Sequence, residues 1–273
     1  MFNIIAACCE KSEKYVDVEN GRALVTGGAQ GIGRAICEAL LSRGCKVCCA
    51  DVNLEEGQRT VEELQKTYGE SNCIFVECDV SSSENFEEAY LKAKESLGNL
   101  NILINNAGVS EGDKIVETNL NGVIYGCNIA LKYMGKNNGG DGGAVVNVAS
   151  VGGLQAMPHN PIYVATNAGI IALTRCYGQD FHYEKSRIKF NVVCPAAVNT
   201  KLYQSATKSM NIDQDIKEFI DKYLPMECLK LLKCCDCTKE TPEKCLYDIK
   251  NGLRNRRNVS DLNNMPRNPI KTK

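Results

Sequence analysis

The sequence predicts an α/β fold with a single doubly wound parallel sheet, and two observations carry that prediction. Short apolar segments rich in β-branched residues alternate with longer segments of helical periodicity from residue 22 to about 224. Six such strands and five helices follow one another in turn, an order that places a parallel sheet between two layers of helices. A chain of 273 residues is long enough for one such domain with an appendage.

The individual elements follow from these two periodicities. A sixth helical pattern, at 201–224, has its isoleucines on one side and fits a substrate-covering lid and a plain packing helix equally well. The predicted strands are 23–26, 46–50, 73–78, 101–104, 144–148 and 188–193, and the predicted helices between them are 31–42, 54–68, 83–97, 114–134 and 163–181.

The chain divides into an N-terminal extension (1–20), the α/β domain (21–226) and a basic tail (227–273). The tail holds 11 Lys and Arg against 6 Asp and Glu, although the whole chain has a net charge of only −1. That near-neutral balance gives no reason to expect a nucleic-acid partner. No apolar run is long enough to span a membrane, and we expect a cytoplasmic protein.

Sixteen cysteines are many for this length. In a cytoplasmic chain they are expected to be reduced thiols, and those in core strands and helices should act as small apolar side chains. The tail cysteines from Cys228 to Cys245 do not form two CxxC pairs and have no histidine nearby, so a divergent tail is favoured over a zinc site and no metal is predicted.

The first crossover carries a nucleotide-binding pattern. Glycines recur in the segment 26–33, between a strand and a helix, where a tight turn lets the backbone approach a pyrophosphate at the helix N-terminus. Asp51 ends the second strand and is placed to accept from a ribose hydroxyl, which favours NAD over NADP; capping of the next helix is the alternative. The cofactor-binding candidates in this glycine-rich segment are Gly27, Gln30, Gly31, Ile32 and Gly33.

Polar side chains also end the next two strands. Asp79, in the segment Cys78–Asp79–Val80, is placed to accept from an adenine amino group, with a helix-capping role as an equal alternative. Asn105 and Asn106 begin the segment Asn-Asn-Ala-Gly, where side-chain amides can lock the strand end to its neighbours beside the cofactor cleft.

Ser150 and Tyr163 form the candidate reaction centre. Ser150 ends the fifth strand, and Tyr163 opens the next helix 13 residues later, so that both hydroxyls can reach one substrate oxygen. The position one helical turn after the tyrosine suits a cation that stabilises a phenolate, and Asn167 stands there. At about 4 Å and an effective dielectric constant of about 20, such a cation contributes about 4 kcal/mol of Coulomb energy. Without it, little phenolate is expected at neutral pH.

These motifs, together with Asn119 and Pro195, resemble the short-chain dehydrogenase/reductase family over about residues 20 to 205. Within that family the chain is most similar to the NAD-dependent 15-hydroxyprostaglandin dehydrogenases. The resemblance implies a single Rossmann-type domain that uses NAD to oxidise a secondary alcohol, with a lipid-like substrate such as a hydroxylated fatty acid or prostaglandin. It also implies a homodimer.

The resemblance assigns roles residue by residue. Tyr163 is the general base, Ser150 orients the substrate oxygen, and Asn119 holds a water of the proton relay. Asn160 contacts substrate. Asn167 occupies the position of the family's catalytic lysine, and the further cofactor contacts implied are Val52, Cys78, Asp79, Val80, Asn106, Tyr163, Asn167, Val198, Asn199 and Thr200.

The chain departs from the family at three places. Asn167 replaces the lysine, Pro195–Ala196 replaces a Pro-Gly pair, and no closing apolar strand is recognisable after Leu224. The departures leave a second hypothesis open: a catalytically impaired member that binds NAD or another ligand as a sensor or as a dimer partner.

Overall fold

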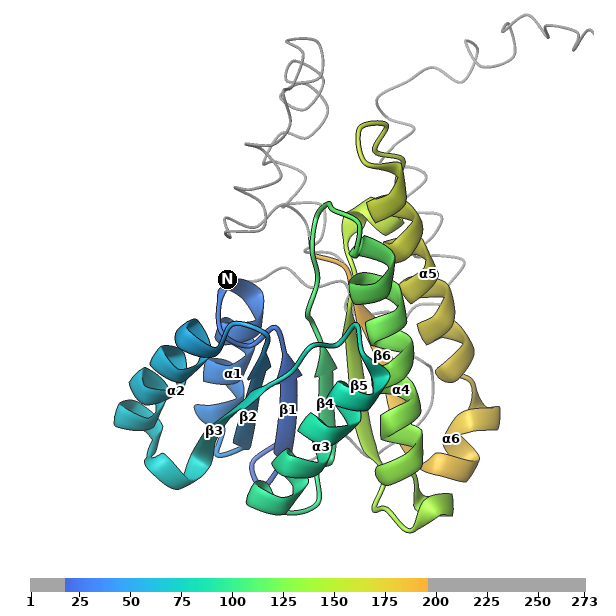
Figure 1. The fold of residues 1–273 in the computed structure, drawn as a ribbon. Coiled ribbons are helices and arrows are strands. Elements are labelled where there is room, and N and C mark those ends of the chain that lie inside the picture. The colour runs from blue at the N-terminus through green and yellow to red at the C-terminus, as the bar shows by residue number, and fades with distance from the viewer. Residues whose placement is uncertain (1–17, 196–273) are drawn as a thin grey trace, which may run out of the picture. The chain divides into compact units, whose positions relative to one another are not determined.

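The computed structural model describes residues 18–195 and confirms the doubly wound sheet (Figure 1). All described strands are parallel and stand in the order β3-β2-β1-β4-β5-β6. The chain reverses its direction of winding between β1 and β4, the point at which such sheets bind ligands. The strands are β1 (Arg22–Thr26), β2 (Lys46–Asp51), β3 (Cys73–Glu77), β4 (Ile102–Asn105), β5 (Gly143–Val148) and β6 (Ile188–Val193).

Helices cover both faces of the sheet (Figure 1). The core beneath α1 and α2 contains Cys49, and the core beneath α3, α4 and α5 contains its neighbour Cys48. Successive side chains of β2 thus enter opposite cores, which explains its continuous apolar sequence. The helices are α1 (Gly31–Leu41), α2 (Leu54–Tyr68), α3 (Ser83–Leu97), α4 (Gly122–Tyr133), α5 (Pro161–Tyr177) and α6 (Asp180–Ser186), with short turns η1 (Glu70–Asn72), η2 (Glu117–Asn121), η3 (Lys136–Asn138) and η4 (Val151–Gly153).

Two predicted helices differ from the structure. The helix predicted at 163–181 begins earlier, because Asn160 caps it and Pro161 occupies its first turn. It ends at Tyr177, and the separate helix α6 follows. The helix predicted at 114–134 is interrupted by the π-helical turn η2, after which the regular helix α4 runs from Gly122. Side-chain periodicity does not distinguish a π turn from the α-helix around it.

The nine cysteines in the described part of the chain are all free thiols, and eight are buried. Burial raises the pKa of the Cys73, Cys78 and Cys127 thiols to about 12. These side chains therefore pack as small apolar groups, as the sequence predicted. Cys176 is the exposed exception among them.

Several predictions concern residues that the structure leaves undescribed. They are most of the N-terminal extension, the helical pattern at 201–224, the tail and its cysteines, and the cofactor contacts Val198, Asn199 and Thr200. Within residues 18–195, no helix has the length and apolar character to cross a membrane. The same residues contain no group of three or more metal-ligating side chains.

Candidate active site

The glycine-rich loop after β1 is shaped for close backbone contact. Gly31 opens α1 with a φ of 57°, a left-handed conformation that favours glycine. A Cβ atom on Gly33 would lie 2.0 Å from the carbonyl oxygen of Gly27, so no other residue fits there. In the described structure no side chain caps α1 at Gln30, and its first turn has no acidic residue. The N–H groups of this turn, including that of Ile32, therefore suit an anionic ligand.

Asp51 connects the end of β2 to this loop. Its Oδ2 atom accepts from the backbone N–H of Ala29 at 3.0 Å, and its Oδ1 atom accepts from that of Asn53 at 3.0 Å. Thr60 of α2 donates its hydroxyl to the carbonyl oxygen of Ala29 at 2.7 Å. Both backbone polar groups of Ala29 are thus hydrogen-bonded to side chains outside the loop. The cap of α2 is Asn53, which rules out the capping alternative for Asp51.

The side chain of Val52 is 66% exposed beside Asp51. This degree of exposure is unusual for a valine and places an apolar surface next to the carboxylate. Such a surface can cover the flat face of a planar ring.

Asp79 follows β3 and organises its own turn. Its Oδ1 atom accepts from the backbone N–H of Ser81 at 2.9 Å and from the Ser81 hydroxyl at 2.6 Å. The hydroxyl bond is the main cause that lowers the pKa of Asp79, and Lys114, with its Nζ atom 3.9 Å from Oδ2, contributes in the same direction. Ser82, and not Asp79, caps α3, so the capping alternative was wrong here too.

The two neighbours of Asp79 point into the protein. Cys78 is 3% exposed and Val80 is 6% exposed, and both belong to the core beneath α3 and α4. A Cβ atom on Gly122 would lie 2.9 Å from Val80, so α4 starts directly against this side chain. Only backbone atoms of Cys78 are therefore suited to contact a cofactor.

Asn106 locks the end of β4 to the glycine-rich loop. Its Nδ2 atom donates to the carbonyl oxygens of Thr26 and Gly27, at 2.9 and 3.2 Å. The hydroxyl of Thr26 accepts from the backbone N–H groups of Asn106 and Ala107. Asn106 thus locks the strand end to its neighbour, as predicted. Its contact with the cofactor stays a prediction.

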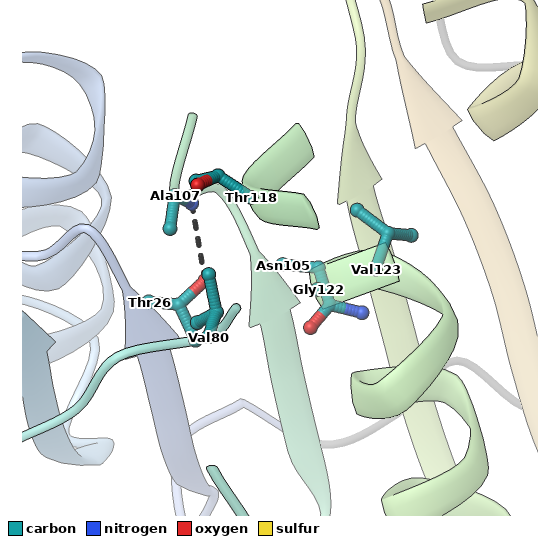
Figure 2. A pocket seen from close by; sticks show the side chains of 7 residues that line it. All are labelled: Thr26, Val80, Asn105, Ala107, Thr118, Gly122 and Val123. Atoms are coloured by element: carbon teal, nitrogen blue, oxygen red, sulfur yellow. Dashed lines mark hydrogen bonds between the residues drawn. The ribbon is translucent and has the colours of Figure 1, made fainter. Parts of the chain in front are cut away.

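A narrow crevice lies where the winding of the sheet reverses (Figure 2). It runs between the carboxyl ends of β1 and β4 and the start of α4. The dashed line in Figure 2 marks the hydrogen bond from the backbone N–H of Ala107 to the hydroxyl of Thr26, two of the residues that line the crevice. The lining residues are Thr26, Val80, Asn105, Ala107, Thr118, Gly122 and Val123.

Asn105 joins the sheet to a buried polar network. Its Nδ2 atom donates to Oδ1 of Asn147 at 2.8 Å, and Asn147 donates to the hydroxyl of Thr174 on α5 at 2.9 Å. Asn105 and Asn147 are register partners on β4 and β5. The Oδ1 atom of Asn105 is buried and has no hydrogen-bond partner among the described residues.

The structure brings Ser150 and Tyr163 together. Ser150 lies two residues after the end of β5 and caps the turn η4, where its Oγ atom accepts from the backbone N–H of Gly152 at 3.1 Å. A Cβ atom on Gly152 would lie 3.5 Å from Ser150 Oγ and also 3.5 Å from Cε1 of Tyr163. The two side chains therefore lie close to one point, and the Sδ atom of Met157 lies nearer still, at 2.8 Å from it. Two hydroxyls on neighbouring side chains can share one oxygen atom of a third molecule.

Asn119 lies in the π-helical turn η2 and is 4% exposed. Its Oδ1 atom accepts from the N–H of Val109, and its Nδ2 atom donates to the carbonyl oxygen of the same residue, both at 2.8 Å. The side chain thus fixes the segment after β4. The water-holding role predicted for Asn119 stays a prediction.

Asn167 lies one turn after Tyr163, as the helical spacing required, and is 3% exposed. Its Nδ2 atom donates to the carbonyl oxygen of Tyr163 at 2.8 Å. The amide therefore binds the preceding turn of its own helix and brings no charge to the phenol.

Asn160 also has a role that the sequence did not reveal. Its Oδ1 atom accepts from the N–H of Tyr163, and its Nδ2 atom donates to the carbonyl oxygen of Ser110 at 2.7 Å. The capping part of this role was recognisable from the Asn-Pro pair before the helix. The bond to Ser110 spans 50 residues and no local pattern indicates it.

Comparison with known proteins agrees with this geometry. Residues 22–211 match the family model described as short chain dehydrogenase. The 15-hydroxyprostaglandin dehydrogenase [NAD(+)] of Rattus norvegicus is 39% identical over 211 residues, which cover 76% of this chain and 79% of that protein.

Solved structures show the same fold. A short chain dehydrogenase/reductase from Burkholderia phymatum in complex with NAD is 25% identical, with a TM-score of 0.64 over 90% of this chain and 82% of that one. Levodione reductase is 28% identical, with a TM-score of 0.66 over 76% of this chain and 83% of that one. By its sequence motifs, its sheet and these similarities, the chain belongs to the short-chain dehydrogenase/reductase family.

Proposed function

We propose that the protein is an NAD-dependent dehydrogenase that oxidises a secondary alcohol. The observation that carries the proposal is the proximity of Ser150 and Tyr163: Oγ of Ser150 and Cε1 of Tyr163 both lie 3.5 Å from the same point, the Cβ position of Gly152. Tyr163 takes the proton of the alcohol as general base, and Ser150 donates to the same oxygen and orients it. NAD, when bound, supplies the acceptor for the hydride.

The residues of the glycine-rich loop fit a dinucleotide. The approach of Gly33 to Gly27 and the uncapped start of α1 leave backbone N–H groups for the pyrophosphate. Asp51 accepts from the adenosine ribose and disfavours a 2′-phosphate, which supports NAD over NADP. The [NAD(+)] in the name of the rat relative supports the same choice. Asp79 and Val52 are assigned to the adenine end.

The substrate is proposed to be lipid-like. Leu154 and Ile162, which lie close in sequence to the Ser150 and Tyr163 pair, are 51% and 54% exposed. Exposed apolar side chains next to a reaction centre suit an apolar substrate. The similarity to 15-hydroxyprostaglandin dehydrogenases supports a hydroxylated fatty acid or prostaglandin. A homodimer and a cytoplasmic location are part of the same proposal, by resemblance to the family.

The test is reduction of NAD by the full-length protein with a panel of secondary alcohols that includes a 15-hydroxyprostaglandin. The assay is run at neutral pH and at about pH 9 to 10, where phenols begin to ionise. Turnover that is lost in Tyr163→Phe supports the proposal. Absence of NAD reduction with every alcohol at both pH values contradicts it.

Asn167 favours a second candidate function, a member that binds NAD without turnover and acts as a sensor or dimer partner. The neutral amide is buried against the backbone of Tyr163 and cannot replace a lysine. Calorimetry with NAD, combined with turnover of the natural protein and of Asn167→Lys, separates the two candidates. Tight binding without turnover, with activity gained in the variant, favours the second.

A further inference from the structure

Asn160 makes hydrogen bonds in two directions. Its Oδ1 atom accepts from the N–H of Tyr163 at 3.3 Å, within the first turn of α5. Its Nδ2 atom donates to the carbonyl oxygen of Ser110 at 2.7 Å, a short distance for an N–H···O bond. Its backbone is fixed as well, since its N–H donates to Met157 and its carbonyl oxygen accepts from Val164. One side chain thus joins the start of α5 to a segment 50 residues earlier.

The segment that contains Ser110 is itself connected by hydrogen bonds to the glycine-rich loop. Ser110 is 7% exposed, and its neighbour Val109 has both backbone polar groups bonded to Asn119. A few residues before them, Asn106 binds the carbonyl oxygens of the glycine-rich loop. Because Asn160 completes this series of bonds, it connects the wall that faces the cofactor to the turn that carries Tyr163.

We propose that Asn160 is a positioning residue, which sets the Tyr163 hydroxyl relative to the segment after β4, and not a substrate-binding amide. The inference rests on the proposed function. A carboxamide supplies an acceptor for Tyr163 and a donor for Ser110 from one planar group. A serine supplies a capping oxygen but is shorter, and a carboxylate has no donor. Both requirements together select asparagine at this position.

The substitution Asn160→Asp separates the two bonds. The carboxylate still accepts from the Tyr163 N–H, and its charge is favourable at a helix N-terminus. It cannot donate to the Ser110 carbonyl oxygen, which it repels. We expect kcat for an alcohol of the panel to fall about 10- to 100-fold, because small displacements of a catalytic group reduce turnover by such factors. KM for the alcohol should stay within about twofold.

Amide hydrogen exchange provides a readout that needs no substrate. Loss of the tether should increase exchange in the peptide covering residues 107–116 of Asn160→Asp. Asn72→Asp is the matched control, because Asn72 also donates to a backbone carbonyl oxygen at 2.7 Å, that of Tyr68 at the end of α2. The control should change neither kcat nor KM, nor exchange in residues 107–116. Asn160→Ser, which keeps a capping oxygen, replaces the aspartate variant if that variant does not fold.

The outcomes are distinct. Lower kcat at constant KM, with faster exchange in residues 107–116, supports the inference. A raised KM at constant kcat assigns Asn160 to the substrate and overturns it, and so does faster exchange with unchanged kinetics. Unchanged exchange overturns the tether whether or not the natural protein turns over an alcohol. Absence of turnover in the natural protein is, by contrast, a failure of the proposed function.

Discussion

The side-chain amide of Asn167 donates to the carbonyl oxygen of Tyr163, so the residue one turn after the tyrosine serves the helix and not the phenol. Asn167 is 3% exposed, and its neighbourhood is tight: a Cβ atom on Gly153 would lie 2.7 Å from its backbone carbonyl carbon. The position thus has a structural use that is independent of charge.

Substituting lysine at this position should raise turnover at neutral pH. A cation about 4 Å from the phenolate contributes about 4 kcal/mol at an effective dielectric constant of about 20. Desolvation of the ammonium offsets part of this, so we expect kcat at pH 7 of Asn167→Lys to rise at least about tenfold. Steady-state kinetics from neutral to alkaline pH measure the gain.

Asn167→Gln is the matched control for that experiment, because it lengthens the side chain without adding charge. It should show no gain at any pH. Equal gains in the glutamine and lysine variants would show that length, and not charge, limits the natural protein.

Gly33→Ala should weaken NAD binding. The added methyl group would lie 2.0 Å from the Gly27 carbonyl oxygen and 2.6 Å from Nδ2 of Asn106, so the loop must move. Overpacking of this kind costs about 1 to 3 kcal/mol, which corresponds to about a 10- to 100-fold rise in Kd if the strain falls on the binding conformation. Calorimetric titration with NAD measures this change.

Gly139→Ala provides the control, since Gly139 has a φ of 87° and no atom lies within 4 Å of its added Cβ. It tests backbone strain without a steric clash. A Gly33→Ala protein that binds NAD as tightly as the natural protein would contradict the assignment of the loop.

Thr60→Val should destabilise the glycine-rich loop from a distance. Thr60 is fully buried, and its hydroxyl donates to the Ala29 carbonyl oxygen at 2.7 Å. Valine keeps the shape but removes the donor, and an unsatisfied buried carbonyl costs about 1 to 3 kcal/mol. We therefore expect the free energy of unfolding, measured by urea titration, to fall by this amount, and NAD binding to weaken. Thr67→Val, at an exposed site on the same helix, should change neither quantity.

Much of this architecture could be predicted from the sequence, because it depends on local patterns. The strand that contains Cys48 and Cys49 is a short apolar run, and the glycine spacing of the loop reflects contacts within a few residues. Even the pairing of Ser150 with Tyr163 follows from a strand end and the next helix start.

What the sequence did not reveal depends on contacts between distant segments. Asn147 stands in the middle of an apolar strand, and its partnership with Asn105 appears only once the register of β4 and β5 is known. The hydrogen bonds from Asn160 to Ser110 and between Asn119 and Val109 likewise cannot be predicted without the tertiary structure. The π turn at η2 is hidden because one extra residue in a turn barely alters the apolar periodicity.

Asp79 should show a pH-dependent contribution to stability. Its pKa is lowered in the folded protein, chiefly because the Ser81 hydroxyl donates to it at 2.6 Å. A carboxyl group with a lowered folded pKa stabilises the native state above its unfolded pKa of about 3.9. That stabilisation is lost as the pH falls through the folded pKa. The side chain is 43% exposed, so the effect should be small.

The cause of this shift can be tested by NMR titration of the Asp79 carboxyl carbon. Ser81→Ala should move the Asp79 pKa upward, toward its ordinary range, because it removes the leading contribution. Lys114→Met should move it less, since the ammonium lies 3.9 Å away and is largely solvated. The unfolding free energy of Asp79→Asn should then approach that of the natural protein at pH values below the folded pKa of Asp79, where both side chains are neutral. A larger shift from Lys114→Met than from Ser81→Ala would mean that charge, and not the hydroxyl, controls this carboxylate.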